Sequence, residues 1–308
     1  MTDFLTVGQQ VLILFLLIGV GFICGKKGII NETASKVMAD VVLYFATPCV
    51  IIHSFQQEMT DERIKGLLVA LASAIAIHVL AILIADVVFR NDADKRRRVL
   101  RFAVVFSNAG YMALPLQKAV LGAEGVFYGA VYVAIFNLTM WSWGLLTMSG
   151  DKKSLSVKKL ILNPGVIGLT VGVIIFLLQW QLPEVLAQPI THLGNLNTPV
   201  PMLLIGYFLS KTNVKQAFRD GRSFGCMAIR LLFMPLLALG GMYLCGIRGD
   251  VLVSMVIAAS APVAAATTMF ATKFNADTSL SVNMVSLTTL CSVITMPLIV
   301  ALAKILSI

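Results

Sequence analysis

The chain has 308 residues, of which 58% are hydrophobic and only 13% charged, and its mean hydropathy is +0.89. A soluble protein of this length would carry far more charge, so the composition excludes a soluble enzyme and indicates a membrane protein. The formal charge of +9 does not indicate nucleic acid as a partner, because the basic residues lie in short joints between apolar segments.

Ten apolar segments predict an all-α polytopic fold with ten transmembrane helices and the lipid bilayer as its surroundings. A helix needs about 20 apolar residues to cross the hydrocarbon core of a bilayer. Lys26 and Lys27 follow the first apolar segment instead of preceding it, which is the reverse of a cleavable signal peptide. The expected spans cover residues 5–25, 36–54, 66–89, 99–121, 124–147, 162–180, 189–209, 223–246, 250–272 and 278–303.

The distribution of basic residues predicts the orientation of the chain. The joints after the odd-numbered spans hold 18 of the 24 Lys and Arg residues, whereas the opposite joints and both tails hold five. Cytoplasmic loops carry an excess of Lys and Arg. We therefore expect a multi-pass protein of the plasma (inner) membrane with both termini non-cytoplasmic. The remaining basic residue, Arg230, lies inside span eight. We interpret it as a structural residue that snorkels toward the cytoplasmic surface, and the alternative is a counter-charge for an anion at the inner mouth of the pathway.

Short matching motifs predict two inverted five-helix repeats. Thr47-Pro48 in span two corresponds to Thr198-Pro199 in span seven at an offset of 151 residues. A similar offset of 153 makes span nine the partner of span four. Because five is an odd number of spans, the second repeat must be inverted in the membrane relative to the first. The expected organisation is a first repeat over residues 1–148, a cytoplasmic linker over 149–161 and a second repeat over 162–308.

Helix breakers in spans four and nine predict that both helices are interrupted. Relative to alanine in a helix interior, Gly110 costs about 1 kcal/mol and Pro115 about 3 kcal/mol. Span nine carries Pro262. In transporters built from inverted repeats, interrupted helices of the two repeats meet near the bilayer midplane and form the substrate site. We therefore expect helices four and nine to be broken at Pro115 and Pro262 and to cross there.

The residues beside these breakers predict a site for an anion. Asn108 supplies an amide donor, and Ser107 and Thr267 supply hydroxyl groups. The N-terminal ends of interrupted helices carry partial positive charge and unpaired N–H groups. No Asp or Glu lies within residues 101–121 or 251–272, although a buried cation would need such a counter-charge. The pattern therefore favours anion binding over cation exchange.

A second polar group lies in the proline-bearing parts of spans two and seven. Asn side chains inside an apolar span are costly unless they are hydrogen-bonded. These side chains either line the transport pathway or tie span seven to its neighbours. The residues are Thr47, Asn195, Asn197 and Thr198.

Several familiar classes of site are missing from the sequence. It contains no GxxxxGK[ST] loop, no HExxH and no His/Cys cluster with the spacing of a metal site. The five cysteines form no CxxC pair and are interpreted as packing residues. We therefore expect no cofactor, no metal and no enzymatic activity.

Two motifs carry a resemblance to a known family. Asn108 is followed seven residues later by Pro115-Leu116, and Pro262 is followed thirteen residues later by Asn275. In these motifs and over nearly its whole length, the chain resembles the auxin efflux carrier family, which includes plant auxin exporters and bacterial permeases for malate or malonate. The resemblance implies ten spans in two inverted repeats, a scaffold part and a transport part with elevator-like movement and, in many members, a homodimer. It also implies that Asn108 contacts the substrate carboxylate. Thr267 replaces the second proline of the family's ninth-helix motif, so the break there depends on Pro262 alone.

These observations together predict a secondary transporter of small organic acid anions, with the carboxylate bound where the helices cross. One alternative is a sodium-coupled symporter of the bile-acid carrier type, with Ser107, Asn108 and Thr267 as oxygen ligands. An alternative of another class is a membrane-embedded sensor or enzyme, for which the sequence offers only scattered acids, histidines and thiols.

Overall fold

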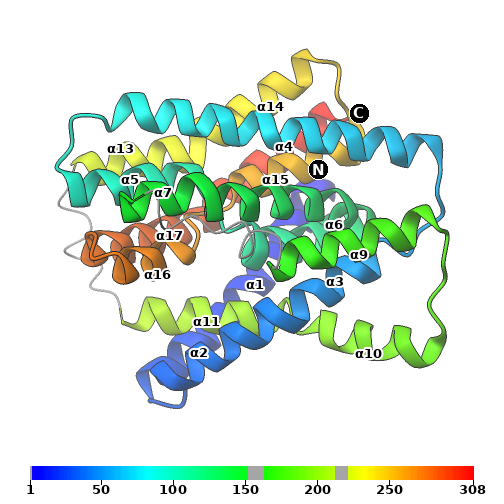
Figure 1. Cartoon of the computed structure of the whole chain (residues 1–308), viewed down its shortest axis with the longest axis horizontal. Coiled ribbons are helices and arrows are strands. Elements are labelled where there is room, and N and C mark those ends of the chain that lie inside the picture. Colours follow the sequence, from blue (N-terminus) through cyan, green and yellow to red (C-terminus); the bar gives the residue numbers. More distant parts are fainter. Residues whose placement is uncertain (1, 152–162, 212–220) are drawn as a thin grey trace.

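The computed structural model describes residues 2–151, 163–211 and 221–308, and in these ranges the chain is helical (Figure 1). The predicted all-α fold is therefore confirmed for this part of the chain. The α-helices are α1 (Thr2–Lys26), α2 (Glu32–Val41), α3 (Thr47–Ser54), α4 (Asp61–Val88), α5 (Asp94–Val105), α6 (Leu114–Thr139), α7 (Leu145–Ser149), α9 (Pro164–Leu177), α10 (Glu184–Asn195), α11 (Pro199–Ser210), α13 (Gly221–Ala228), α14 (Met234–Leu244), α15 (Gly249–Ser260), α16 (Ala266–Lys273) and α17 (Thr278–Leu306). Four π-helical turns join some of them, namely η1 (Val42–Ala46), η2 (Ala109–Ala113), η3 (Met140–Gly144) and η5 (Ile229–Phe233).

Five helical runs in the described ranges are long and apolar enough to cross a membrane. They are Glu32–Ser54, Asp61–Val88, Ala109–Ser149, Gly221–Leu244 and Thr278–Leu306. Three shorter apolar helices accompany them, at Leu12–Lys26, Pro164–Leu177 and Gly249–Ser260. The multi-pass character is thus confirmed, while the ten-span inverted repeat stays a prediction.

Within the described residues, three of the ten predicted spans are not continuous helices. Predicted spans four, seven and nine are interrupted, so that α5, α10 and α15 each end inside the predicted span. Predicted span five begins where expected, because the run labelled α6 consists of two helices that meet at a kink at Gly122. Gly122 turns the chain with φ 66° and ψ −144° inside α6, a backbone conformation that glycine adopts without steric cost.

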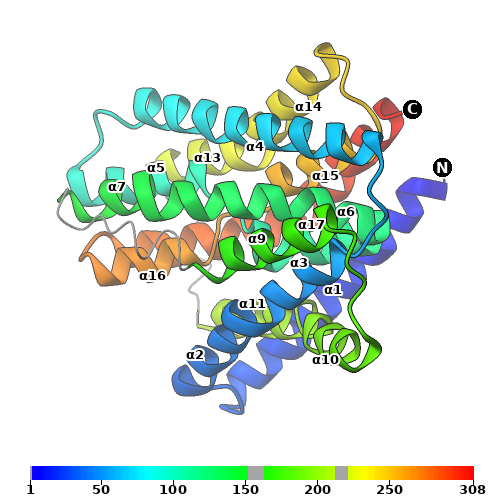
Figure 2. The same ribbon diagram turned by 45° about the vertical axis from the view of Figure 1, so that its right-hand side comes forward.

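The helices form two packed groups that meet along α6 and α17. In both views α1, α2, α3, α10 and α11 lie on one side of the molecule and α4, α5, α13 and α14 on the other (Figures 1 and 2). We call α1, η1, α2, α3, α9, α10 and α11 the α1 group, because they pack mainly on one another, and the remaining helices the α15 group. The two termini lie at the end of the bundle opposite the joint between α4 and α5.

Prolines follow three of the π-helical turns in the same register. Each proline is the second residue of the α-helix that succeeds η1, η2 or η5. A proline has no N–H to donate and its ring pushes aside the carbonyl of the preceding turn. The wider π turn, with its i→i+5 bonding, accommodates this defect without ending the helix. The prolines are Pro48, Pro115 and Pro235.

Candidate functional site

Helices α5 and α15 stop short, and the residues that follow them pair with each other. Ser107 and Val263 form an isolated antiparallel backbone bridge. The amide of Asn108 donates to the carbonyl oxygen of Pro262 at 2.7 Å. Backbone groups that leave a helix inside a membrane need partners from protein or from a water-filled cavity. Here each interrupted helix supplies those partners to the other.

A second bond flanks the bridge on its other side. The amide of Ala264 donates to the carbonyl oxygen of Phe106 at 2.9 Å. Ala261 has extended backbone angles (φ −61°, ψ 146°), which is the conformation that a residue before proline prefers. We call residues 106–108 and 261–264 the crossing.

The predicted break at Pro115 is wrong in its position, whereas Pro262 lies in the crossing. The chain leaves the helix at residues 106–108, and it is helical again from Ala109 onward. Pro115 is buried in the second position of α6, where η2 accommodates it. Gly110 lies within η2, where a Cβ atom would meet no other atom within 4 Å. Gly110 therefore borders open space next to the crossing.

Three predicted side chains lie buried at or next to the crossing, and two of them have unused hydrogen-bonding groups. Asn108 is 4% exposed, and Ser107 and Thr267 are fully buried. Among the described residues, the amide Nδ2 of Asn108 and the hydroxyl Oγ1 of Thr267 have no hydrogen-bond partner. The Ser107 hydroxyl lies 3.4 Å from that of Tyr132. An unpaired buried polar group costs about 1–3 kcal/mol, so these two groups are the natural contacts for a polar ligand.

Four helix ends meet at the crossing. The helical run from Ala109 and helix α16 begin there, and both contribute partial positive charge. Helices α5 and α15 end there and contribute partial negative charge, which offsets the positive charge of the two N-terminal ends. No acidic residue belongs to the crossing. The exposed Asp40 of α2 interacts electrostatically with the hydroxyl of Tyr111 in η2.

Arg230 lies deeper in the protein than the favoured sequence interpretation predicts. It is fully buried, so the interpretation as a snorkelling residue is wrong. Its Nη1 donates to the carbonyl oxygen of Val104 at 2.9 Å and its Nη2 to that of Ala259. The available signal was an arginine inside an apolar span, which is a functional candidate by default.

Thr288 of α17 holds the crossing from a third helix, and its hydroxyl should contribute measurably to stability. The hydroxyl accepts the amide hydrogen of Val263 at 3.1 Å and donates to the carbonyl of Met284. Thr288→Val keeps the shape but leaves a buried N–H unpaired, which costs about 1–3 kcal/mol. We expect a lower unfolding temperature of the purified protein in detergent. Thr289→Val is the matched control, because that hydroxyl bonds only to Val285 of its own helix. Equal unfolding temperatures for the two variants would contradict the role of Thr288.

The second predicted group is divided between two places. Thr47 and Asn197 are buried and joined by a hydrogen bond of 2.9 Å between Oγ1 and Oδ1, which ties α3 to the start of α11. Thr198 is the residue before α11, and its side chain makes no capping hydrogen bond to that helix. Asn195 is exposed and accepts a bond of 2.9 Å from the amine of Lys118. The group is therefore not one site.

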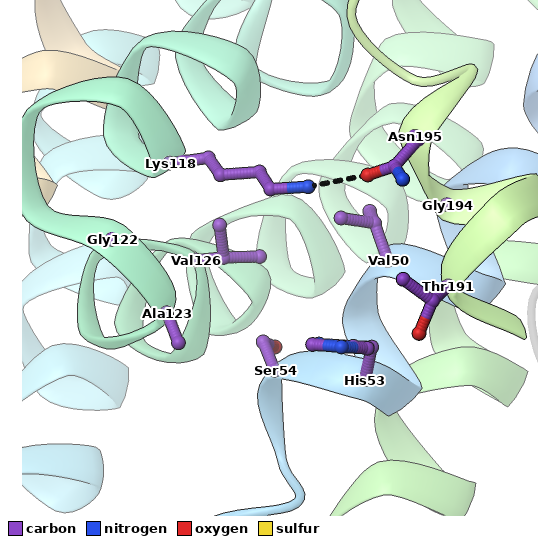
Figure 3. Close-up of a pocket in the computed structure, with 10 residues that line it drawn as sticks. All are labelled: Val50, His53, Ser54, Lys118, Gly122, Ala123, Val126, Thr191, Gly194 and Asn195. Carbon is purple, nitrogen blue, oxygen red and sulfur yellow. Dashed lines mark hydrogen bonds between the residues drawn. The ribbon is translucent and has the colours of Figure 1, made fainter. Parts of the chain in front are cut away.

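Asn195 and Lys118 line a pocket between the α1 group and α6 (Figure 3). The pocket has a volume of about 220 Å³. Lys118 is ten residues from Asn108, which is about 15 Å along a helix. The pocket is thus separate from the crossing. Its lining residues are Val50, His53, Ser54, Lys118, Gly122, Ala123, Val126, Thr191, Gly194 and Asn195.

Comparisons with known proteins place the chain among transporters. The sequence model of a family described as membrane transport protein matches residues 6–300. An uncharacterized transporter of Methanothermobacter thermautotrophicus is 24% identical over 298 residues, covering 94% of this chain and 96% of the relative. A second uncharacterized transporter, from Methanocaldococcus jannaschii, is 23% identical over 303 residues with the same coverage. The chain is a transporter and not an enzyme, and it belongs to this family of membrane transport proteins, the auxin efflux carrier family that its motifs resemble.

Proposed function

We propose that the protein is a secondary transporter of small organic acid anions and that it binds a carboxylate at the crossing. The observation that carries the proposal is the unpaired amide Nδ2 of Asn108, buried beside two interrupted helices. A carboxylate accepts hydrogen bonds and donates none when ionised. It therefore matches an N–H donor that has no acceptor among the described residues.

The neighbouring residues support the same ligand. The Thr267 hydroxyl is a second unpaired group that can donate to a carboxylate oxygen. Gly110 leaves space beside Asn108 that any side chain would fill. Pro262 keeps Ala261 extended and offers its carbonyl to the Asn108 backbone, so the Asn108 side chain stays available. A sodium site would need several oxygen ligands and a counter-charge instead.

We further propose that the α15 group carries the bound anion across the membrane as one unit. Both sides of the crossing belong to this group, and buried bonds join α6 to α15 through Gln117 and Ser254. The contact with the α1 group, in contrast, includes non-directional packing of Phe55 and Phe176 on Phe127, the pocket of Figure 3 and an exposed bond from Lys118 to Asn195. An exposed polar bond contributes little to stability and is easily broken. Elevator-like movement along this boundary fits the arrangement.

Flux measurements with purified protein in liposomes test the proposal. The panel is radiolabelled malate, malonate and an aromatic acid, each with and without sodium and pH gradients. Malonamide, the uncharged diamide of malonate, serves as the unlabelled competitor that lacks the charge. We expect saturable uptake of at least one acid, competition by other carboxylates and none by the diamide.

The other outcomes each decide against a part of the proposal. Competition by the diamide as strong as that by malonate would contradict a site that selects anions. Uptake that stops without sodium would favour the symporter of the bile-acid carrier type. No flux of any carboxylate would contradict the proposed substrate class.

A further inference from the structure

A single guanidinium group binds the C-terminal ends of both interrupted helices. The carbonyl of Val104 belongs to the last turn of α5, and that of Ala259 to the last turn of α15. The last four carbonyls of a helix have no partner within the helix. Arg230 is fully buried, and its planar group presents N–H donors in a fixed fork that reaches both helices at once.

The charge of Arg230 is not balanced by an acid in the described part of the chain. The titratable groups that interact with it are the hydroxyl of Tyr132, the thiol of Cys226 and the imidazole of His78. The His78 ring packs against that of Tyr132 in a tilted arrangement, with 4.8 Å between centroids. None of these groups is a carboxylic acid. Because an arginine stays protonated in proteins, a net positive charge is buried here.

The charges of the helix ends show why this arginine matters. Each end carries roughly half an elementary charge, positive at N-termini and negative at C-termini. Two helical runs begin at the crossing and two end there, so the four ends together sum to about zero. The helix ends alone do not make the site electropositive. With Arg230, the total becomes about one positive charge.

We propose that Arg230 is the fixed counter-charge of the crossing, so that the site is matched to one carboxylate group. This inference rests on the proposed anion transport and adds the residue that sets its charge selectivity. Arg230 acts through the electric field of its guanidinium group and through its hydrogen bonds to the two carbonyls, so it is a positioning residue. One bound carboxylate neutralises the buried charge, whereas a neutral molecule leaves it uncompensated.

The variants Arg230→Lys and Arg230→Gln test how far binding depends on the charge of residue 230 and how far on its hydrogen bonds to the two carbonyls. Both side chains are shorter than arginine and both can donate to a carbonyl, but only lysine can carry a charge, and burial without an acid partner favours its neutral form. At an effective dielectric constant of about 20, two unit charges separated by about 8 Å change a binding constant by roughly 30-fold. We expect malonate, which carries two carboxylates, to bind at least about 30-fold more weakly to Arg230→Gln than to the wild type, with Arg230→Lys between them and similar unfolding temperatures for the two variants. Arg248→Gln is the matched control, because Arg248 also donates to backbone carbonyls but is exposed.

A second variant leaves Arg230 in place and balances its charge. Cys226 is buried within electrostatic range of the guanidinium, so Cys226→Asp places an acid beside it. We expect this variant to lose malonate affinity by a factor similar to that of Arg230→Gln, while Cys226→Ser binds like the wild type. This comparison decides the matter even where Arg230→Gln does not fold.

The readout is the dissociation constant for radiolabelled malonate on purified protein, with malonamide as competitor. An affinity of Arg230→Gln equal to that of the wild type, or an unchanged affinity for Cys226→Asp, would overturn the inference. A wild-type protein that binds and transports no carboxylate would instead overturn the proposed function itself.

Discussion

Asn108→Asp should abolish carboxylate uptake and leave the protein folded. The substitution exchanges the unpaired NH₂ group for a negatively charged oxygen of nearly the same size. The backbone bond from Asn108 to Pro262 is unaffected. Two like charges about 4 Å apart repel by about 4 kcal/mol at an effective dielectric constant of about 20, a loss of roughly 1,000-fold in affinity. Uptake into liposomes at neutral pH would fall to the level of empty vesicles.

Asn108→Ala should have a smaller effect of the same sign. It removes one hydrogen bond to a charged group, which is worth about 1.5–3 kcal/mol. The order wild type, Asn108→Ala, Asn108→Asp is therefore the expected order of decreasing uptake. Protonation removes the charge of the introduced acid, so uptake by Asn108→Asp should partly recover when the pH is lowered.

Asn195→Asp is the matched control for the position of the site. Asn195 is exposed and bonded to the amine of Lys118, and an acid there forms an ion pair. Uptake by this variant should equal that of the wild type. The reverse pattern, with Asn195→Asp inactive and Asn108→Asp active, would show that the substrate binds in the pocket of Figure 3 and not at the crossing.

The two sides of the crossing differ in how far the sequence predicts them. Pro262 restricts the residue before it to extended backbone, and Ala261 adopts it, so this break is encoded locally. The break at residues 106–108 contains neither proline nor glycine. It exists because backbone bonds from residues more than 150 positions away replace the helical ones. A rule based on local breakers selected Pro115, which a π turn absorbs.

The chemistry of the candidate site was predictable by residue type and not by geometry. The polar pair Ser107-Asn108 in an apolar run indicates a buried polar site wherever the chain breaks. The sequence places Asn195 and Asn197 two residues apart, yet only the packing of α10 and α11 determines that one is exposed and the other bonded to Thr47. The depth of Arg230 along its helix likewise does not show which helix ends it meets. Such facts depend on tertiary contacts between distant segments.

Gly206→Leu should destabilise the protein more than any substitution at an exposed helix position, because α1 and α11 touch through glycines. A Cβ atom on Gly206 would overlap the carbonyl oxygen of Ile18 and the backbone of Gly21. A Cβ atom on Gly21 would likewise overlap the backbone of Leu203. Backbone cannot swing aside as a flexible side chain does, so the two helices must separate. Overpacking costs typically 1–3 kcal/mol where side chains can adjust, and we expect the upper end or more here.

Thermal unfolding of the purified protein in detergent measures this effect, and Gly19→Leu supplies the control. Gly19 lies on the same α1 helix, but a Cβ atom there meets nothing within 4 Å. Leucine also favours the helix over glycine by up to about 1 kcal/mol, so this control should unfold at or above the wild-type temperature. Because close approach through small residues is how membrane helices gain packing without a hydrophobic driving force, the α1 group depends on this contact. Similar unfolding temperatures for Gly206→Leu and Gly19→Leu would show that α1 and α11 are not held together at Gly206.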